Sequence, residues 1–546
     1  SRAKWAFGFA MIGGAALLAD GVITPSLTIL SSVEGLTLLG RGIPVIPIVL
    51  GILTALFFMQ QFGTKAIGRF FGPIMVVWFL MLAWLGAGQI LRHPAILGAV
   101  SPVYAWKFLT EVPEGFLLLG AVFLATTGAE AMYSDLGHCG VKNIRISWVI
   151  VKTSLLINYF GQGAWVVGKL SIPYSIENPF FGIMPQWFLI PGIIMATLAA
   201  IIASQALISG SFTLISEAIS LNFWPKIRII YPTHIKGQMY IPAVNFGLFI
   251  CCVLVVLIFR ESANMEAAYG LSITLTMLMT TILLSIYLHV YKFPGWIVFT
   301  LLTVYLIIEG SFLLANMHKF SAGGWFTMLL AGFIGSVMFI WYHGRKLKNS
   351  FTEFVKIDEF FPVIAALHND DAIPKYATNA VFLTKANRIT DIESKIIYSI
   401  LNKQPKRADV YWLLHVDIHD DPHLKEYSVT QLIPGLLIKV DFRIGFKVQP
   451  RINLFLRQVV AELSSTGEID ILSRYPSLRP HHIPGDFRFT LIDRIQTYDF
   501  DFAAFDQLII NLYNQIKRLG ISEIKAYGLD TSSVVEEMVP LRLEVK

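Results

Sequence analysis

The sequence predicts an all-α polytopic membrane protein that is followed by a soluble α/β domain. Of its 546 residues, 55% are hydrophobic and only 15% are charged, which is more apolar and less charged than soluble globular domains. The apolar residues are concentrated in residues 1–344, where runs of roughly 20 apolar residues recur, the length that crosses about 30 Å of hydrocarbon. Residues 345–546 mix charged and apolar residues and therefore predict a separate domain.

Ten of the apolar runs are predicted to be transmembrane helices. They are residues 5–30, 43–61, 67–91, 115–135, 147–167, 187–217, 241–259, 265–290, 295–316 and 322–343. Because their number is even, both ends of the region lie on one side of the membrane. The net charge of +6 is explained by the loops of that side, so the charge predicts membrane topology and not a nucleic-acid partner.

The loops of that side carry 13 Lys and Arg residues, whereas the loops of the opposite side carry six. The 13 are Arg2, Lys4, Lys65, Arg69, Lys142, Arg145, Lys226, Arg228, Lys236, Lys292, Arg345, Lys346 and Lys348, and the six are Arg41, Arg92, Lys107, Lys169, Arg260 and Lys319. The positive-inside rule therefore predicts a protein of the plasma (inner) membrane whose C-terminal domain is cytoplasmic.

The soluble domain alternates two kinds of pattern. Residues 408–418 and 436–446 are rich in β-formers, whereas residues 453–463 and 505–519 are amphipathic with a helical period, which predicts an α/β domain. His415, Asp417 and His419 alternate along the first strand, and an exposed strand face explains them better than a metal site does. The chain has no Walker phosphate loop, nucleotide-binding GxGxxG or nucleophile elbow, so we expect neither an enzyme nor a cofactor.

Ionisable residues inside membrane spans are costly, and each is a candidate for a role in a pathway or site. Asp20, Thr24 and Thr28 follow at i, i+4 and i+8 and share one helix face. Pro25 lacks an N–H and leaves a carbonyl near Gly21 free. This oxygen-bearing stripe predicts a cation site. In the alternative interpretation, the Thr hydroxyls bond to their own helix and Asp20 pairs with a basic residue.

A second set of oxygen-bearing residues lies in residues 125–135, where small residues surround Glu130. They predict an unwound segment that lines a cavity, and Thr127 shares a face with Glu130. Close helix packing is the alternative. The small and polar residues of 196–210 fit a pathway and helix packing equally well. Oxygen groups without Cys or His favour a hard cation over a transition metal, and an alkali ion fits best.

The other ionisable residues of the spans give weaker indications. Glu217, Glu266 and Lys152 lie near predicted span ends, where an interfacial charge is the simpler interpretation. Glu309 lies deeper in its span, but the sequence indicates no partner for it.

In the segments around Asp20 and Glu130, and in several others, the sequence resembles the KUP/HAK/KT family of potassium uptake permeases. The matching segments are residues 20–35, 61–64, 128–138, 158–164, 202–210, 404–411 and 528–532. The resemblance implies an amino acid–polyamine–organocation-type fold with two inverted five-helix repeats. It also implies that Asp20, Thr24 and Thr28 on one helix, and Thr127 and Glu130 on another, bind potassium and couple it to protons.

The chain departs from this family in two places. Leu18 and Ala19 stand where the family has a Tyr before its Gly-Asp, and the acidic motif of the family's first helix is absent. We therefore expect residues 1–546 to begin at the family's third span and, without the first two, not to transport.

The function expected from the resemblance is potassium import by proton-coupled symport. Glu130 is the expected proton carrier. The apolar span favours the protonated form of its carboxyl group, whereas an adjacent cation favours the ionised form. Asp20 is the alternative carrier. The other functions considered are an amino-acid permease of the same superfamily and a non-transporting sensor. Expected partners are the potassium ion, the proton and the lipid bilayer, with a homodimer and a small-molecule regulator of the soluble domain left open.

Overall fold

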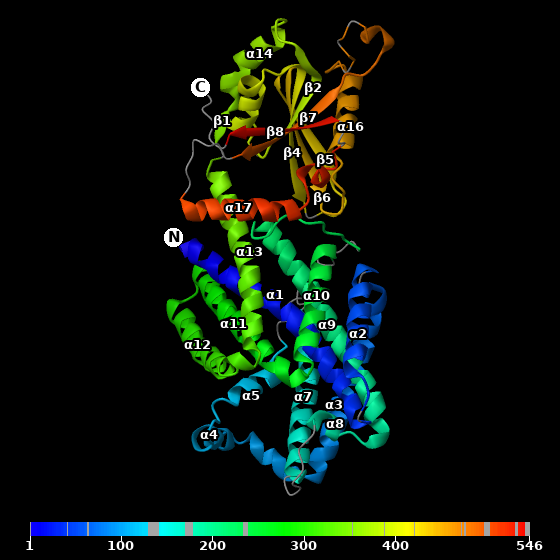
Figure 1. Cartoon of the computed structure of the whole chain (residues 1–546), viewed down its shortest axis with the longest axis vertical. Coiled ribbons are helices and arrows are strands. Elements are labelled where there is room, and N and C mark those ends of the chain that lie inside the picture. Colours follow the sequence, from blue (N-terminus) through cyan, green and yellow to red (C-terminus); the bar gives the residue numbers. More distant parts are fainter. Residues whose placement is uncertain are drawn as a thin grey trace. The chain divides into compact units, whose positions relative to one another are not determined.

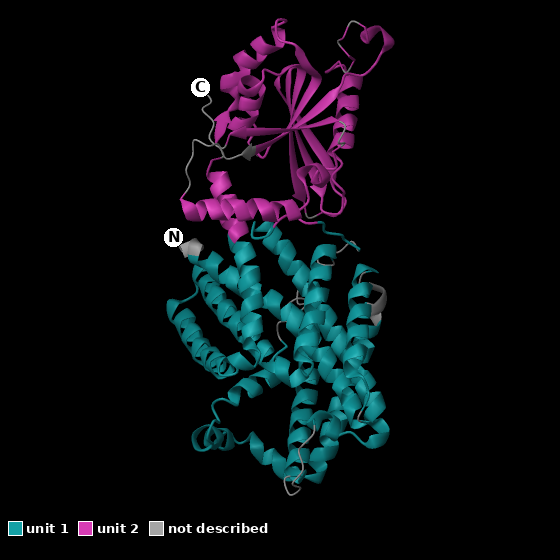
Figure 2. Cartoon of the chain, viewed as in Figure 1, with its two compact units in different colours: residues 1–224, 228–233, 237–339 teal, residues 225–227, 234–236, 340–546 magenta. Residues whose placement is uncertain are grey.

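The structure is a computed structural model that describes most of the chain. The described residues are 2–40, 42–62, 65–128, 141–169, 178–232, 239–351, 353–386, 388–419, 421–470, 472–473, 475, 477–495, 503–529 and 533–540. They form two compact units (Figure 2). The first comprises Ser1–Trp224, Arg228–Thr233 and Gly237–Phe339, and the second comprises Pro225–Ile227, His234–Lys236 and Ile340–Lys546.

The first unit is a bundle of helices (Figure 1). In chain order these are α1 (Arg2–Glu34), α2 (Val45–Met59), α3 (Lys65–Arg92), α4 (Pro102–Glu111), α5 (Leu119–Thr126), α7 (Val141–Lys169), α8 (Pro179–Gly182), α9 (Leu189–Ser220), α10 (Pro242–Phe259), α11 (Ser262–Val290), α12 (Gly295–Met317) and α13 (Gly324–Ser350). The predicted division between residues 344 and 345 falls inside α13, whose residues from Ile340 onward belong to the second unit.

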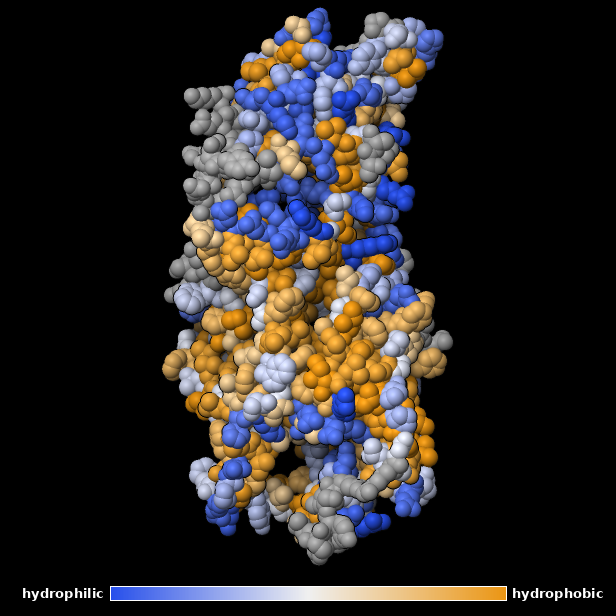
Figure 3. All heavy atoms as spheres, viewed as in Figure 1, coloured by the Kyte–Doolittle hydropathy of each residue, from blue (hydrophilic) through white to orange (hydrophobic). Residues whose placement is uncertain are grey.

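Within the described residues, eight helices are long and apolar enough to cross a membrane. They cover eight of the ten predicted spans. The predicted span 115–135 extends into residues outside the described part, and the predicted span 147–167 corresponds to α7, which is not one of the eight. On the face shown in Figure 3, hydrophobic side chains (orange) gather over the helices of the first unit, as expected for a surface that contacts lipid.

Helix α1 lies at the centre of the first unit. It packs against α2, α9, α10 and α11, and most of its residues from Ala15 to Val33 are buried or half-buried. Pro25 lies inside α1, and the helix continues through it to Glu34. The central position of α1 explains why this helix can bury Asp20 completely.

Helices α3 and α7 approach closely at a pair of glycines. A Cβ placed on Gly86 would lie 2.7 Å from the Cα of Asn158, and one on Gly161 would lie 2.7 Å from the carbonyl oxygen of Gly86. Small residues permit such approaches between membrane helices. The Asn158 amide, which donates to the Leu82 carbonyl at 3.2 Å, also links the two helices.

We therefore expect Gly86→Ala to destabilise the protein by roughly 1–3 kcal/mol, because the new methyl group meets backbone atoms that cannot move independently. Thermal unfolding of the detergent-purified protein measures the change. Gly88→Ala is the matched control on the same helix, since a Cβ at Gly88 meets no atom within 4 Å. Equal melting temperatures for the two variants would contradict the close approach.

The second unit contains a six-stranded sheet with the strand order β5-β6-β4-β2-β7-β8. Its strands are β2 (Lys375–Leu383), β4 (Arg407–His419), β5 (Lys425–Ile433), β6 (Leu437–Gly445), β7 (Phe487–Ile495) and β8 (Val534–Pro540). All neighbouring pairs are parallel except β5 and β6. A separate antiparallel pair is formed by β1 (Phe354–Lys356) and β3 (Asp391–Glu393).

Helices cover both faces of this sheet (Figure 1). On one face, α14 (Phe361–Asn369) and α15 (Ser394–Tyr398) pack with Phe382 and Leu413 in one hydrophobic cluster. On the other face, α16 (Ile452–Ser465) packs with Val381 and Trp412 in a second cluster. Alternating residues of each strand therefore supply two cores, as expected for a doubly covered parallel sheet.

The predictions for the soluble domain agree with its elements. The β-rich runs 408–418 and 436–446 correspond to β4 and β6, and the amphipathic runs 453–463 and 505–519 correspond to α16 and α17 (Ala504–Leu519). The prediction of an α/β domain is confirmed. The last helix is α18 (Glu523–Ala526).

Candidate functional site

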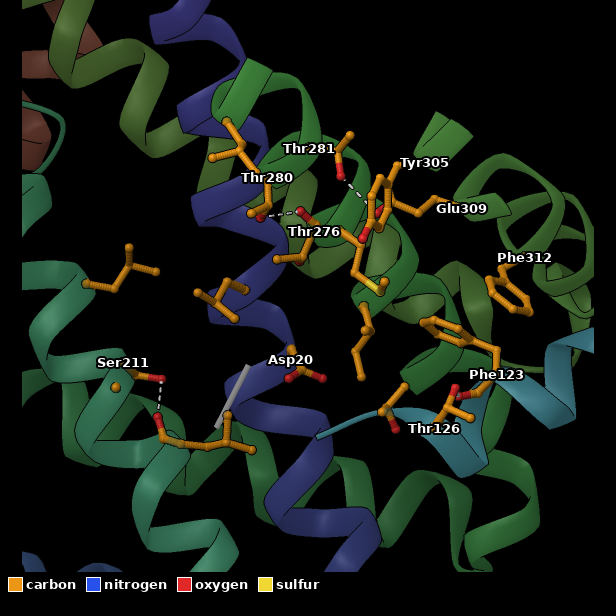
Figure 4. A pocket seen from close by; sticks show the side chains of 18 of the residues that line it. Asp20, Phe123, Thr126, Ser211, Thr276, Thr280, Thr281, Tyr305, Glu309 and Phe312 are labelled. Carbon is orange, nitrogen blue, oxygen red and sulfur yellow. Dashed lines mark hydrogen bonds between the residues drawn. The ribbon is translucent and has the colours of Figure 1, made fainter. Parts of the chain in front are cut away.

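Five helices of the first unit, α1, α5, α9, α11 and α12, line a cavity of about 640 Å³ (Figure 4). Its apolar lining includes Phe123, Ile273 and Phe312. Its polar lining consists of Asp20, Thr126, Thr127, Ser211, Thr213, Glu217, Thr276, Thr280, Thr281, Tyr305 and Glu309. The cavity therefore combines hydrophobic walls with hydroxyl and carboxylate oxygens.

Asp20 lies on α1 and is fully buried. Its Oδ1 accepts a hydrogen bond from the Thr24 hydroxyl at 2.7 Å and one from the Ser272 hydroxyl at 3.2 Å. The i, i+4 relation predicted for Asp20 and Thr24 is therefore a direct contact. Ser272 belongs to α11, so the carboxylate is held by two helices and its position relative to the cavity is restrained.

Thr28 is oriented differently from the sequence prediction. Its hydroxyl donates to the carbonyl of Thr24 at 2.7 Å and lies 3.2 Å from the Ser204 hydroxyl. Neither Thr24 nor Thr28 is among the described residues that line the cavity. For Thr28, the structure agrees with the alternative in which the hydroxyl bonds to its own helix, and its role in binding an ion stays a prediction.

Helix α5 ends at the cavity. The helix stops at Thr126, Thr127 is extended with φ −76° and ψ 173°, and Gly128 has φ +118°. The chain therefore leaves the helix where the unwound segment was predicted to begin, and the rest of that segment, from residue 129, lies outside the described residues. The Thr127 hydroxyl donates to the Leu124 carbonyl at 2.8 Å and lies 3.0 Å from the Tyr269 hydroxyl. Glu130, predicted to share this site, lies outside the described residues.

The threonines of α11 are cavity residues that the sequence interpretation missed. Thr276 and Thr280 are four residues apart, and Thr281 follows directly, so they present hydroxyls along the cavity side of one helix. The segment that contains them is visibly rich in hydroxyl residues, but these are distributed around the helix, so periodicity could not indicate which face meets the cavity. The hydroxyl of Thr280 donates to the carbonyl of Thr276 at 2.8 Å.

The segment 196–210 combines both roles that its sequence allowed. Ala196, Ala199 and Ser204 are buried in helix packing, whereas Leu207 and Gly210 line the cavity. Both belong to α9, so one helix packs through its first part and lines the cavity further along.

The charge of the cavity has one sign. Three carboxylates, those of Asp20, Glu217 and Glu309, line it, and no Lys, Arg or His is among its described lining residues. Such a lining attracts cations. Hydroxyl and carboxylate oxygens are ligands that suit a hard cation better than a transition metal.

The chain matches two family models. Residues 1–346 match the K+ potassium transporter integral membrane domain, and residues 377–543 match the K+ potassium transporter C-terminal domain. The chain is also similar to curated proteins named "Probable potassium transport system protein Kup". It is 53% identical to the one of Cytophaga hutchinsonii, over 97% of this chain and 82% of that protein.

Two further relatives carry the same name. The protein of Flavobacterium psychrophilum is 49% identical over 100% of this chain and 84% of its own length. The protein of Clostridium perfringens is 47% identical over 99% of this chain and 84% of its own length. Together with the eight apolar helices, these matches make the chain a multi-pass membrane protein. The chain belongs to the K+ potassium transporter family.

Proposed function

We propose that this protein imports potassium ions across the plasma membrane and that the ion passes through the cavity at Asp20. The observation that carries the proposal is the acidic cavity, in which a fully buried carboxylate is held by two hydroxyls. A potassium ion that enters would exchange hydration water for hydroxyl, carbonyl and carboxylate oxygens. The relatives' printed name, a potassium transport system protein, supports the same ion.

The end of α5 supports a site for a cation. The C-terminal end of a helix carries a partial negative charge, and Thr126 and Thr127 at that end line the cavity. Broken helices at membrane depth are typical of transporters with inverted repeats. We therefore propose the amino acid–polyamine–organocation-type inverted repeat for this chain, with Asp20, Thr24, Thr28, Thr127 and Glu130 as the residues that contribute to potassium binding.

Proton-coupled symport is the proposed mode of transport. A carboxylate in an apolar site binds either a proton or a cation, so occupancy by one disfavours the other. Glu130 and Asp20 are the proposed carriers, and the positive-inside rule supports a cytoplasmic C-terminal domain. No separate cofactor enters the proposal.

Two other functions are less well supported. An amino-acid permease needs a group for the substrate carboxylate, for which a helix N-terminus or a basic residue is suited, whereas the described lining of this cavity is acidic. A sensor that signals through the soluble domain would not need buried carboxylates on a cavity in the helical unit.

Uptake of radioactive rubidium by cells that lack their own potassium uptake systems tests the proposal. Cells that express the complete protein are expected to take up rubidium and to grow at limiting potassium. Uptake of labelled amino acids without rubidium uptake would identify a permease, and uptake of neither would favour the sensor.

A further inference from the structure

Glu309 is an acidic residue buried on the most exposed of the apolar helices. Only 6% of the most apolar stretch of α12 is buried in the structure, whereas 28% or more of the corresponding stretch is buried in each of the other seven candidate spans. Glu309 itself is 4% exposed and is one of four buried residues of α12, with Val298, Ala315 and Asn316. The only strongly polar strip of this helix therefore faces the interior of the unit at Glu309 and Asn316.

Among the described residues, the carboxyl group of Glu309 has one hydrogen-bond partner. Its Oε1 accepts a hydrogen bond from the Thr281 hydroxyl of α11 at 2.8 Å. Its Oε2 is buried and has no hydrogen-bond partner among the residues that the structure describes. A buried acceptor without a partner is costly when the group is charged, so the ionised carboxylate of Glu309 is incompletely compensated by the surrounding protein.

Glu309 opens onto the same cavity as Asp20 (Figure 4). The titratable groups that the other lining elements present to this cavity are Asp20 on α1 and Glu217 on α9, and α12 adds Tyr305. From α11 and α5, which pack against α12, the described lining residues are apolar or carry hydroxyls. No described cavity residue is a base that could neutralise Glu309.

We propose that Glu309 is a second proton-binding group of this cavity and that a cation entering the cavity displaces its proton. A buried carboxylate without a basic partner can be compensated by a proton on the carboxyl group or by a cation close to it. The inference rests on the proposed function in that the displacing cation is the transported one. It adds a proton site on α12, distinct from Asp20 and Glu130.

Thermodynamic linkage between proton binding and cation binding predicts how strongly pH changes the affinity for rubidium. If proton and cation exclude each other completely, each tenfold rise in proton concentration raises the rubidium concentration for half-saturation by up to about tenfold, over the pH range in which Glu309 titrates. By reciprocity, saturating rubidium must release the proton from Glu309. If the hydrogen bond between α11 and α12 had only a structural role, neither the pH dependence nor the proton release would be expected. That bond would also persist in Glu309→Gln, because a glutamine side chain accepts a hydrogen bond from the Thr281 hydroxyl equally well.

The test uses the complete protein purified in detergent, with rubidium chloride as the probe. Infrared difference spectra recorded with and without rubidium report the loss of protonated carboxyl groups through their carbonyl stretch. We expect rubidium to diminish this band in the wild-type protein and in the control Glu266→Gln, which removes another partly buried carboxyl group from α11 outside the cavity. In Glu309→Gln the rubidium-dependent band should be smaller by the contribution of one carboxyl group, whereas the proposed carriers Asp20 and Glu130 keep their own contributions.

Two further variants keep the result interpretable if Glu309→Gln folds poorly. Glu309→Asp retains a carboxyl group and should retain a rubidium-dependent band, and Thr281→Val removes the donor to Oε1 and should shift the pH at which the band disappears. In the wild-type protein the half-saturating rubidium concentration should rise as pH falls. In Glu309→Gln this rise per pH unit should be smaller by up to about tenfold, because one of the groups that exchange a proton for the cation is gone.

A rubidium-dependent band in Glu309→Gln as large as that of the wild type, together with the full pH dependence, would overturn the inference, and so would a wild-type protein whose spectrum does not respond to rubidium. Rubidium uptake measured on the same preparations separates this failure from that of the proposed function. Uptake without a Glu309 signal rejects only the proton site, whereas absence of both uptake and rubidium binding rejects both.

Discussion

Asp20→Asn is expected to reduce the affinity for rubidium by about 10- to 150-fold. The substitution keeps the size of the side chain and an acceptor oxygen for Thr24 and Ser272, but it removes the negative charge from the buried centre of the cavity. An interaction with a charged group is worth about 1.5–3 kcal/mol, which corresponds to that range. The concentration dependence of rubidium uptake in cells lacking other uptake systems measures the effect.

Glu217→Gln is the control for this prediction. Glu217 also lines the cavity, but its side chain is exposed and contacts Ser220, so water compensates for its charge. We expect this variant to change half-saturation by less than about threefold. Normal uptake by Asp20→Asn, or equal losses in the two variants, would show that burial of the carboxylate does not create the binding site.

Lys406→Met is expected to destabilise the soluble domain by about 3–5 kcal/mol. The ammonium group of Lys406 is fully buried and lies 3.1 Å from Glu537 Oε1, and the Ser399 hydroxyl donates to Glu537 Oε2 at 2.7 Å. Burial lowers the pKa of Lys406, and the Glu537 carboxylate opposes that shift. Removing the lysine alone leaves Glu537 buried with one hydroxyl partner, and this uncompensated charge accounts for the loss.

The double variant Lys406→Met, Glu537→Leu should recover most of this stability, because an apolar pair often replaces a buried ion pair without cost. Lys403→Met is the matched control, since Lys403 is exposed and donates only to the Met538 carbonyl at 2.9 Å; it should change stability by less than about 0.5 kcal/mol. The urea concentration at which protease cleaves the soluble domain of the purified protein measures all three. A double variant as unstable as Lys406→Met would refute the explanation.

The elements that the sequence predicted well are those with strong local signals. Long apolar runs predicted eight helices that the structure contains, because the requirement to satisfy backbone hydrogen bonds in hydrocarbon leaves helices as the form that a single apolar segment can adopt. The β-forming residues of 408–418 predicted β4. The small residues around Gly128 predicted the end of α5, because a backbone with positive φ favours glycine.

The orientation of polar side chains within these helices was harder to predict. Thr24 follows Asp20 by four residues, and Thr28 follows Thr24 by four residues. The hydroxyl of Thr24 nevertheless donates to the Asp20 carboxylate, whereas that of Thr28 donates to a backbone carbonyl. A threonine in a helix has both options available. The aspartate four residues before Thr24 offers a side-chain acceptor, whereas the residue four before Thr28 is a threonine. The contact of Thr28 with Ser204 of α9 at 3.2 Å is one that no local pattern indicates.

The sequence by itself determined the membrane class, the α/β domain and the family, since each depends on composition, periodicity or a contiguous motif, and it predicted Asp20 as a site residue. Only the tertiary structure decided which oxygens share a cavity. Thr281 and Glu309, which line the cavity, and Ser272, which donates to Asp20, are more than 250 residues from Asp20 and lie in helices whose weak amphipathicity does not indicate an inward face. Packing of α11 and α12 against their neighbours sets that face, because side-chain burial in a bundle depends on contacts between helices and not on the sequence of one helix.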